Sequence, residues 1–448
     1  MEENTNIRYC SFCGRPESDT LHILVGDNVC ICEECANLAA SIFSKRREEA
    51  EAEARHCCIC GRHEADDVHL IKGKEGHICE DCVNLAKEAF NKQHEEEDAK
   101  EMKTIDELPK PKEIKAFMDD YVIGQDVAKQ KIAVAIYNHY KRIFVKSENP
   151  DVDVQKSNIL LCGPTGTGKT YMVQSVAKML DVPFAIADAT VFTEAGYVGE
   201  DVESILSRLL MAADYNVKKA ERGIVFIDEI DKLARKSGNN PSLSKEVGNE
   251  GVQQGLLKLL EGSDVLVTKN GGRKHPEQPM IKINTKNILF ICGGAFDGLD
   301  KYIERRANVH RIGFATENEA AKFDKKNPLK YLNTQDLKDY GMIPELLGRI
   351  PVVTYTEELD NDALKRILIE PKNAIIKQYT EIFKLDGIDL TFDDDVFDFI
   401  VEKVADFGLG ARSLRGVMEQ IMNDLMFELP SANVDKYNVT LEYAKSKF

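Results

Sequence analysis

Residues 163–170 read Gly163-Pro164-Thr165-Gly166-Thr167-Gly168-Lys169-Thr170, and this stretch does more than any other to predict the fold. It fits the phosphate-loop pattern G-x-x-x-x-G-K-[ST], between an apolar strand candidate at 158–162 and a helical pattern at 171–180. In such a loop the backbone N–H groups surround phosphates, Lys169 reaches the β- and γ-phosphate oxygens, and the Thr170 hydroxyl ligates Mg²⁺. The stretch therefore predicts an ATP and Mg²⁺ site on an α/β fold.

A second motif follows about sixty residues later, where the apolar run Gly223-Ile-Val-Phe-Ile ends in Asp228 and Glu229. We expect Asp228 to hold the Mg²⁺ and Glu229 to polarise the attacking water. A phosphate-loop pattern by itself also arises by chance or in a structural turn, but an acidic strand at this spacing makes that alternative weak. The two motifs together predict ATP hydrolysis.

Composition limits the class of protein. The chain has 448 residues, enough for two or three domains, and its 43% hydrophobic and 30% charged content is ordinary for a soluble protein. No stretch approaches the roughly 18 apolar residues of a membrane span, and the polar N-terminus does not resemble a signal peptide. We therefore expect a cytoplasmic protein without a membrane partner. The net charge of −17 disfavours nucleic acid as a partner.

Ten of the twelve cysteines precede residue 83, and eight of them form a repeat. Two Cys-x-x-Cys pairs separated by 18 residues recur 47 positions later. This spacing is typical of a closed, structural four-thiolate zinc site, and cytoplasmic cysteines stay reduced. The sequence therefore predicts two structural Zn²⁺ sites. Their ligands are Cys10, Cys13, Cys32 and Cys35 in the first copy, and Cys57, Cys60, Cys79 and Cys82 in the second.

Other roles for these residues are less favoured. A redox role for the Cys-x-x-Cys pairs lacks the βαβ frame of a thioredoxin nearby. Cys30 and Cys58 break the repeat, so we leave them out of the ligand sets. His22 and His69 are equivalent positions, but the four-cysteine sets are already complete, and we expect both on the surface.

The residue pattern changes at about Pro109. Charged runs at 45–55 and 94–101 precede this point, and alternating apolar strand and amphipathic helix patterns follow it, as is typical of an α/β core. On these motifs and their order, the chain resembles the ClpX family of AAA+ unfoldases, which feed the ClpP peptidase, over nearly every residue from Tyr9 onward. The resemblance implies an AAA+ large subdomain and a small, mostly helical subdomain, preceded by the two zinc modules. It also implies a homo-hexamer, with ClpP, protein substrates and adaptor proteins as partners.

The expected domain boundaries follow from the motifs and the resemblance. They are zinc module 1 at 1–44, a linker at 45–55, zinc module 2 at 56–92, a linker at 93–110, the large subdomain at 111–357 and the small subdomain at 358–448. The familiar family pattern has one zinc module, whereas this chain has two. Doubling permits pairing within one subunit, a broader choice of adaptors or higher avidity, and the sequence leaves these possibilities open.

The resemblance also assigns further nucleotide residues. Val122 and Ile123 would contact the adenine, Arg349 in Glu345-Leu-Leu-Gly-Arg would be an arginine finger for the neighbouring subunit, and Arg412 in Gly410-Ala-Arg would contact phosphates of its own subunit. Without the resemblance, an arginine after Leu-Leu-Gly is more often a solvated or salt-bridged residue. We expect Arg415 to serve structure or the subunit contact. The strand at 287–294 ends without the Asn or Thr common at the first sensor, so no residue is assigned there.

Four loops resemble the substrate-handling and docking loops of the family. Tyr197 and Val198, flanked by glycines, match the first pore loop, in which an aromatic side chain grips a passing polypeptide, and 235–246 matches the second. Arg273, Lys274 and His275 match a basic loop at the pore entrance, although composition alone also fits a small anion site. Ile312, Gly313 and Phe314 match the tripeptide that docks on the peptidase, with a short strand edge as the alternative.

The sequence therefore predicts an ATP-dependent unfoldase and translocase. It contains neither Gly-x-Ser-x-Gly nor His-Glu-x-x-His, so peptide cleavage would have to come from a partner. A nucleic-acid-remodelling AAA+ protein is disfavoured by the acidic charge and by the lack of a basic helix after either zinc site. A scaffold with vestigial ATPase activity is disfavoured because Lys169, Asp228, Glu229 and Arg349 are all intact.

Overall fold

The chain divides into two compact units, residues 1–103 and 104–448. The computed structural model describes residues 8–20, 22–26, 29–43, 56–64, 68–74, 76–101, 108–144, 152, 154–193, 200–234, 243–268, 280–309, 324, 327–407, 410–432 and 434–448. Tyr197 and Val198, the basic loop at 273–275 and the docking tripeptide at 312–314 lie outside these ranges, as does 235–242 of the second pore loop.

The first unit contains the same small fold twice. A two-stranded antiparallel hairpin is followed by a helix in each copy, and the two hairpins have the same register, since Ile23 pairs with Cys32 and Leu70 with Cys79. The elements are β1 (Ile23–Val25), β2 (Cys30–Cys32) and α1 (Glu33–Phe43), then β3 (Leu70–Lys72), β4 (His77–Cys79) and α2 (Glu80–Glu101). Helix α2 continues to Glu101, through the first part of the range that we expected to be a linker.

The two copies share one hydrophobic core. Ile31, Ala36 and Ala39 of the first copy and their repeat equivalents in the second are all at most 5% exposed and belong to one cluster; the equivalents are Ile78, Val83 and Ala86. Polar contacts also cross between the copies, because Lys74 Nζ donates to the Cys13 carbonyl at 3.1 Å. Of the possibilities that the doubling permits, pairing within one chain is therefore present.

The expectation that His22 is exposed was wrong. It is 8% exposed, and its ring stacks on Phe90 of the second copy with 6.3 Å between ring centroids. The equivalent His69 is exposed, as expected. The burial of His22 depends on a residue in the other copy, so the pattern within one repeat could not reveal it.

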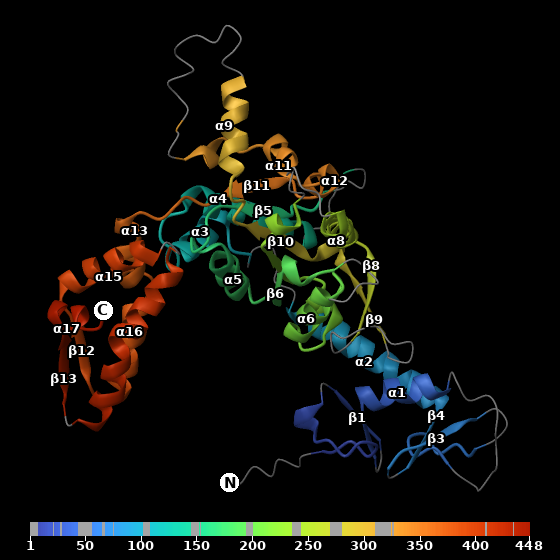
Figure 1. Cartoon of the computed structure of the whole chain (residues 1–448). Helices are drawn as coiled ribbons and strands as arrows, with labels where there is room; N and C mark the ends of the chain where they lie inside the picture. The colour runs from blue at the N-terminus through green and yellow to red at the C-terminus, as the bar shows by residue number, and fades with distance from the viewer. Residues whose placement is uncertain are drawn as a thin grey trace. The chain divides into compact units, whose positions relative to one another are not determined.

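The second unit is built on a parallel five-stranded sheet, which confirms the predicted α/β class (Figure 1). The strand order is β11-β5-β10-β7-β6. The strands are β5 (Ile159–Cys162), β6 (Phe184–Asp188), β7 (Ile224–Asp228), β10 (Leu289–Gly294) and β11 (Val352–Tyr355). Because all five are parallel, the phosphate loop after β5 and the acidic pair after β7 lie at the same edge of the sheet.

Alternate side chains of the central strands enter two different cores, as expected for a sheet covered on both faces. In β5, for example, Ile159 and Leu161 join one cluster and Leu160 and Cys162 the other. Helices α3 (Pro111–Asp119), α4 (Asp126–Phe144) and α5 (Lys169–Leu180) supply the first cluster. The second cluster receives α6 (Ser204–Ala212), α8 (Leu243–Glu261), α9 (Leu299–Val309), α11 (Thr334–Tyr340) and α12 (Pro344–Gly348).

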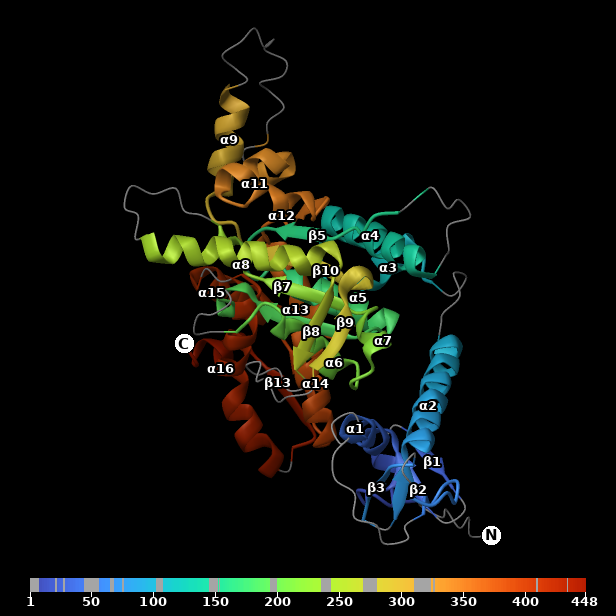
Figure 2. The same cartoon turned by 90° about the vertical axis from the view of Figure 1, so that its right-hand side faces the viewer.

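Smaller elements complete this part of the chain. Helix α7 (Val217–Ala220) lies between α6 and β7 in the sequence. Strands β8 (Asp264–Thr268) and β9 (Met280–Asn284) pair as an antiparallel hairpin, which Figure 2 shows near α6 and α7.

The C-terminal part of the second unit is mostly helical and has a core of its own, as predicted. Its elements are α13 (Asn361–Ile369), α14 (Ile375–Leu385), β12 (Asp389–Phe392), α15 (Asp394–Phe407), α16 (Arg412–Glu428), β13 (Lys436–Val439) and α17 (Leu441–Lys445). Residues 356–360 connect β11 to α13. Among the described helices of the chain, none has the length and apolar character needed to span a membrane.

Candidate nucleotide and zinc sites

The phosphate loop has a backbone that only glycine adopts easily at three positions. Gly163, Gly166 and Gly168 have φ angles of 142°, 77° and 87°. A Cβ at Gly163 would also lie 2.3 Å from the Thr356 hydroxyl oxygen, so the strand end packs directly against residue 356. Helix α5 begins at Lys169, which places the loop at a helix N-terminus, where backbone N–H groups and the helix dipole favour anions. The loop therefore fits a bound phosphate chain.

Lys169 is held inside this loop. Its Nζ donates to the carbonyls of Gly163 at 2.7 Å and Pro164 at 2.8 Å, and the residue is only 8% exposed. Burial lowers the pKa of Lys169, while the carboxylates of Asp228 and Asp231 act in the opposite direction. The ammonium group is thus positioned at the loop by two carbonyls, close to where phosphates would bind.

The predicted magnesium ligands meet across the edge of the sheet. The Thr170 hydroxyl donates to Asp228 Oδ2 at 3.2 Å, and the backbone N–H of Glu229 donates to Asp228 Oδ1 at 3.0 Å. A hydroxyl and a carboxylate are oxygen ligands of the kind that Mg²⁺ prefers. Glu229 has a φ angle of 57°, an uncommon conformation for a residue other than glycine that tends to occur at functional sites.

A cavity of about 330 Å³ connects these groups. Lys169, Thr170, Asp228 and Glu229 line it from the large subdomain, and Arg412, the first residue of α16, lines it from the small subdomain. The residues predicted to act on the nucleotide of their own subunit therefore line one cavity. Sequence reasoning missed other residues that line it; these include Tyr171, Asp231, Lys232, Ala295, Asp297 and Ala411.

Asp231 explains why the strand β10 ends in small residues. It is 4% exposed, and its Oδ1 accepts a hydrogen bond from the Ala295 N–H at 3.2 Å. A Cβ on Gly294 would lie 2.6 Å from the same oxygen, so a larger side chain does not fit there. The buried carboxylate of Asp231, which follows β7 in the chain, thus lies beside the end of β10. The sequence offered no sensor residue at this end of β10. The position of Asp231 three residues after Asp228 was the only signal in the sequence.

A second cavity of about 350 Å³ is lined by the predicted adenine contacts. Val122 and Ile123 are 7% and 6% exposed and face residues of the small subdomain across this space. Arg415 also lines the cavity, and its Nη2 donates to Gln378 Oε1 at 2.8 Å. The other lining residues are Tyr121, Gly166, Thr167, Gly168, Tyr171, Leu359, Ile367, Pro371, Asn373, Ile375 and Ala411.

Arg349 lies apart from these cavities. Its side chain is 53% exposed, and its Nη2 forms an ion pair with Glu261 at 2.8 Å. It is absent from the described residues that line either space. An exposed arginine at the end of α12 is available to another molecule, but the salt-bridged alternative that we considered is present as well.

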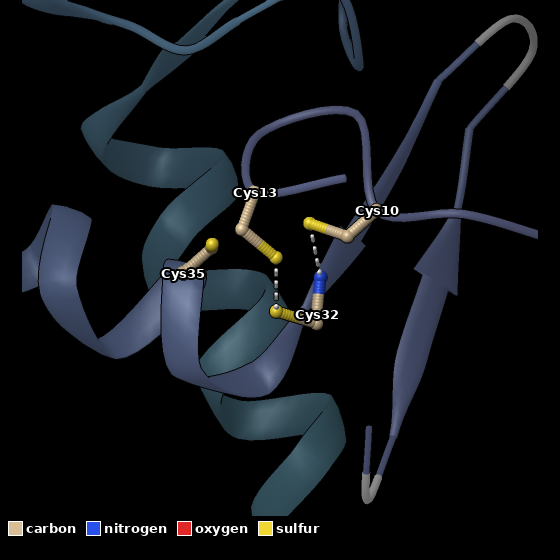
Figure 3. Close-up of side chains that lie close together, drawn as sticks. All are labelled: Cys10, Cys13, Cys32 and Cys35. Atoms are coloured by element: carbon tan, nitrogen blue, oxygen red, sulfur yellow. Dashed lines mark hydrogen bonds between the residues drawn. The ribbon is translucent and has the colours of Figure 1, made fainter. Parts of the chain in front are cut away.

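The eight predicted zinc ligands form two separate clusters in the first unit. In each, four Sγ atoms lie within 4.8 Å of one another. Neighbouring sulfurs are 3.7 Å apart between Cys13 and Cys32 and 3.6 Å apart between Cys60 and Cys79. Tetrahedral zinc with Zn–S bonds of about 2.3 Å needs sulfurs about 3.8 Å apart. Figure 3 shows the first cluster, in which Cys10 and Cys13 come from a turn. Cys32 lies at the end of β2, and Cys35 lies near the start of α1.

The surroundings of the two clusters follow the repeat. A backbone N–H donates to a thiol in each, from Cys32 to Cys10 at 3.3 Å and from Cys79 to Cys57 at 3.4 Å. Burial raises the pKa of a thiol, but hydrogen bonds from backbone groups of Cys13 and Cys32 lower the pKa of Cys10 to about 7. Likewise, Arg62 outweighs burial and lowers the pKa of Cys60 to about 6. Burial raises the pKa of Cys32 to about 11 and also raises the pKa of Cys35, Cys79 and Cys82. Zinc binds thiolates and releases their protons on binding, so it is the spacing of the four sulfurs in each cluster that fits the metal.

Comparison with known families agrees with this division of the chain. Residues 8–45 and 55–92 each match the family described as "ClpX C4-type zinc finger". Residues 154–353 match "AAA domain (Cdc48 subfamily)", and residues 359–441 match "C-terminal, D2-small domain, of ClpB protein". Both zinc clusters therefore belong to one recognised type of zinc finger.

Comparison with individual proteins covers the whole chain. The chain is 56% identical over 447 residues to a protein of Bacteroides thetaiotaomicron named "ATP-dependent Clp protease ATP-binding subunit ClpX". The alignment covers 100% of this chain and 97% of the relative. The chain belongs to the ClpX family. Proteins of the same name from Bacteroides fragilis and Porphyromonas gingivalis are 55% and 51% identical, over 99% and 100% of this chain and 96% and 97% of their own lengths.

Membership of the ClpX family, together with the AAA domain, makes this chain an ATPase that uses ATP and Mg²⁺ and carries two zinc sites. The alignment with these ClpX relatives runs over both zinc modules, because it includes nearly every residue of the chain.

Proposed function

We propose that this chain unfolds proteins with the energy of ATP hydrolysis, threads them through the pore of a homo-hexamer and delivers them to a ClpP peptidase. The observation that carries the proposal is the nucleotide cleft, in which Arg412 of the small subdomain faces the phosphate loop and the acidic pair of the large subdomain. A nucleotide held by both subdomains links hydrolysis to their relative movement. The name of the relatives, which describes an ATP-binding subunit of a Clp protease, supports the same function.

We assign the chemical roles from the geometry. Thr170 and Asp228 would hold the Mg²⁺, which would supply positive charge against the developing negative charge, and Lys169 would neutralise charge on the β- and γ-phosphates. Glu229 orients and polarises the water, because its backbone directs it into the cavity beside Asp228. Arg412 acts on the phosphates of its own subunit.

Arg349 completes the site of a neighbouring subunit in this proposal. It is exposed and outside both cavities of its own chain, as a residue that acts in trans must be. A cation at the transferring phosphoryl group stabilises charge in the transition state. Glu261 holds the guanidinium group until it meets that phosphate.

The remaining assignments are predictions from the family resemblance. Tyr197 and Val198 grip the polypeptide in the pore, Arg273, Lys274 and His275 attract it at the entrance, and Ile312–Phe314 docks on the peptidase. The paired zinc modules recognise substrates or adaptor proteins. We infer a cytoplasmic setting for this work.

Degradation of a tagged, folded fluorescent protein tests the proposal. The full chain, ATP and ClpP are mixed with this substrate, and loss of fluorescence is followed together with peptide release. We expect ATP-dependent loss of both, and the deletion of 312–314 should retain unfolding without peptide release. Brisk ATP hydrolysis with no unfolding of any tagged substrate would contradict the unfoldase assignment.

A further inference from the structure

The segment that leads from the sheet into the small subdomain is attached to the phosphate loop. Thr356, the first residue after β11, is fully buried, and its backbone N–H donates to the Cys162 carbonyl at 2.8 Å. Its hydroxyl lies 2.8 Å from the hydroxyl of Thr167, which is 4% exposed. The segment 356–360 therefore begins in direct contact with a residue of the phosphate loop.

This contact continues to Lys169 through shared acceptors. The Thr167 hydroxyl donates to the Pro164 carbonyl at 2.9 Å, so its oxygen is left to accept a hydrogen bond from Thr356. The same Pro164 carbonyl accepts a hydrogen bond from Lys169 Nζ at 2.8 Å. A continuous hydrogen-bonded path thus runs from Lys169 through Pro164 and Thr167 to Thr356.

A second attachment comes from the adenine side of the cleft. The side chain of Gln125, which is 5% exposed, forms two hydrogen bonds with the backbone of Glu357. Its Nε2 donates to the carbonyl at 2.9 Å, and its Oε1 accepts from the N–H at 2.7 Å. Gln125 follows Val122 and Ile123 closely in the sequence, and the carbonyl of Val122 is itself held by the buried ammonium group of Lys129.

We propose that Thr356 and Gln125 couple the bound nucleotide to the position of the small subdomain. Phosphates that engage Lys169 change the hydrogen bonding of Pro164, and hence of Thr167 and Thr356. Adenine that packs on Val122 and Ile123 acts on Gln125 and Glu357. Both inputs reach the first two residues of the segment that ends at α13 (Figure 1). The inference rests on the proposed function, because it explains how hydrolysis moves the small subdomain.

Thr356 and Gln125 are positioning residues that touch neither cavity, since neither lines the spaces described above. The hydrogen bond between Thr356 and Thr167 is buried and those of Gln125 to Glu357 are partly buried, so separation of the partners would leave polar groups unsatisfied. The phosphate loop and the segment 356–357 are therefore expected to move together.

Amide hydrogen exchange of residues 357–364, measured with and without ATP, tests the coupling directly. The measurement uses the full chain with Glu229→Gln, so that ATP remains bound. We expect ATP to slow exchange in this segment. Thr356→Val, which replaces the hydroxyl with a methyl group, should reduce that ATP-induced protection by at least about fivefold, the low end of typical coupling between sites. Thr356→Ser should restore it.

The chain offers a matched control two residues away. Thr354 lies in β11, is 1% exposed, and its hydroxyl has no hydrogen-bond partner among the described residues. Thr354→Val makes the same substitution two residues earlier, inside β11 and without touching the path, and it should leave the ATP effect unchanged. The proposal would be overturned if Thr354→Val lost as much ATP-induced protection from exchange as Thr356→Val does. It would also be overturned if Thr356→Val kept the full protection.

A second variant guards against a failure of Thr356→Val to fold. Gln125→Met keeps the size of the side chain and removes both bonds to Glu357, and we expect it to weaken the ATP effect in the same direction. Full protection in a folded Gln125→Met chain would remove Gln125 from the proposal. Because exchange is measured without a protein substrate, a chain that fails to unfold the fluorescent protein contradicts the proposed function, whereas unchanged exchange in these variants contradicts the coupling.

Discussion

Two neighbouring carboxylates at the end of β7 have different surroundings. Asp228 accepts hydrogen bonds from the Thr170 hydroxyl and from the N–H of Glu229. Glu229 has a left-handed backbone and lines the cavity, where the proposed mechanism needs a group that polarises water. This division suits one metal ligand and one general base.

Replacement of Glu229 tests the second role. Glu229→Gln should bind ATP with near-normal affinity and hydrolyse it about 10²–10⁴-fold more slowly, since the amide cannot accept a proton from water. Steady-state hydrolysis and binding of a fluorescent nucleotide are the two measurements. Turnover near the parent rate would remove Glu229 from the mechanism.

The exposed position of Arg349 leads to a prediction about mixed assemblies. Arg349→Ala alone should lower hydrolysis by about 10³-fold, as expected for an arginine finger. If Arg349 acts in trans, mixing Arg349→Ala chains with Glu229→Gln chains should restore part of the activity. In such a ring an intact site on one chain receives the arginine of the other.

A control variant accompanies this experiment. Glu261→Gln removes the ion-pair partner of Arg349 and should retain hydrolysis, because the arginine itself remains. If mixtures of the two inactive chains stay inactive while both still assemble, Arg349 acts within its own subunit or only in structure.

At the scale of elements, the two zinc fingers depend on each other. Helices α1 and α2 pack through small and β-branched side chains in one cluster, to which both modules contribute. A module of about 40 residues has too small a core to be stable without its metal. Loss of one zinc therefore withdraws apolar contacts from the other module.

Cys79→Ser should expose this dependence. We expect the variant chain to lose the zinc of the second module and to release the remaining zinc to a chelator at least about tenfold faster than the parent, because the shared core is lost. Zinc content and release rates are measured on the full chain. Cys58→Ser is the matched control, since Cys58 lies outside the ligand cluster and both zincs should stay. A remaining zinc that dissociates at the parent rate would show that the modules are independent.

At the scale of the whole ATPase unit, the small subdomain approaches the phosphate loop at Gly410. This residue has a φ angle of 59°, and a Cβ there would lie 3.2 Å from the Thr165 carbonyl. The approach closes the cleft in which Arg412 faces Lys169. The left-handed backbone conformation therefore favours glycine, and a Cβ would also have to displace the Thr165 carbonyl slightly.

Gly410→Ala should weaken ATP binding severalfold, because the strained residue displaces the start of α16 from the phosphate loop. Gly416→Ala makes the same change inside α16, where nothing lies within 4 Å of the added Cβ. This control should leave ATP binding unchanged and stabilise the helix by about 0.5–1 kcal/mol. Nucleotide titration and thermal unfolding distinguish the two variants, and equal ATP affinities would contradict the role of Gly410.

Contiguous motifs made much of the protein predictable. The α/β class, the presence of two zinc sites and the requirement for ATP and Mg²⁺ were all confirmed. These features depend on spacing within a loop, a strand end or a repeat, and such spacing is present in the sequence itself. The roles of Val122, Ile123, Arg349 and Arg412 stay predictions, although the structure places three of them, all except Arg349, at the two cavities.

The sequence by its motifs determined which chemical groups each module carries, because the groups that bind phosphate, magnesium and zinc belong to short motifs with recognisable residue types and spacing. Only the tertiary structure decided which distant groups meet. The burial of His22 against Phe90, the place of Asp231 at the end of β10 and the contact of Thr356 with Thr167 all join residues from different elements. Contacts of this kind depend on how the helices and strands pack, and no local pattern records that packing.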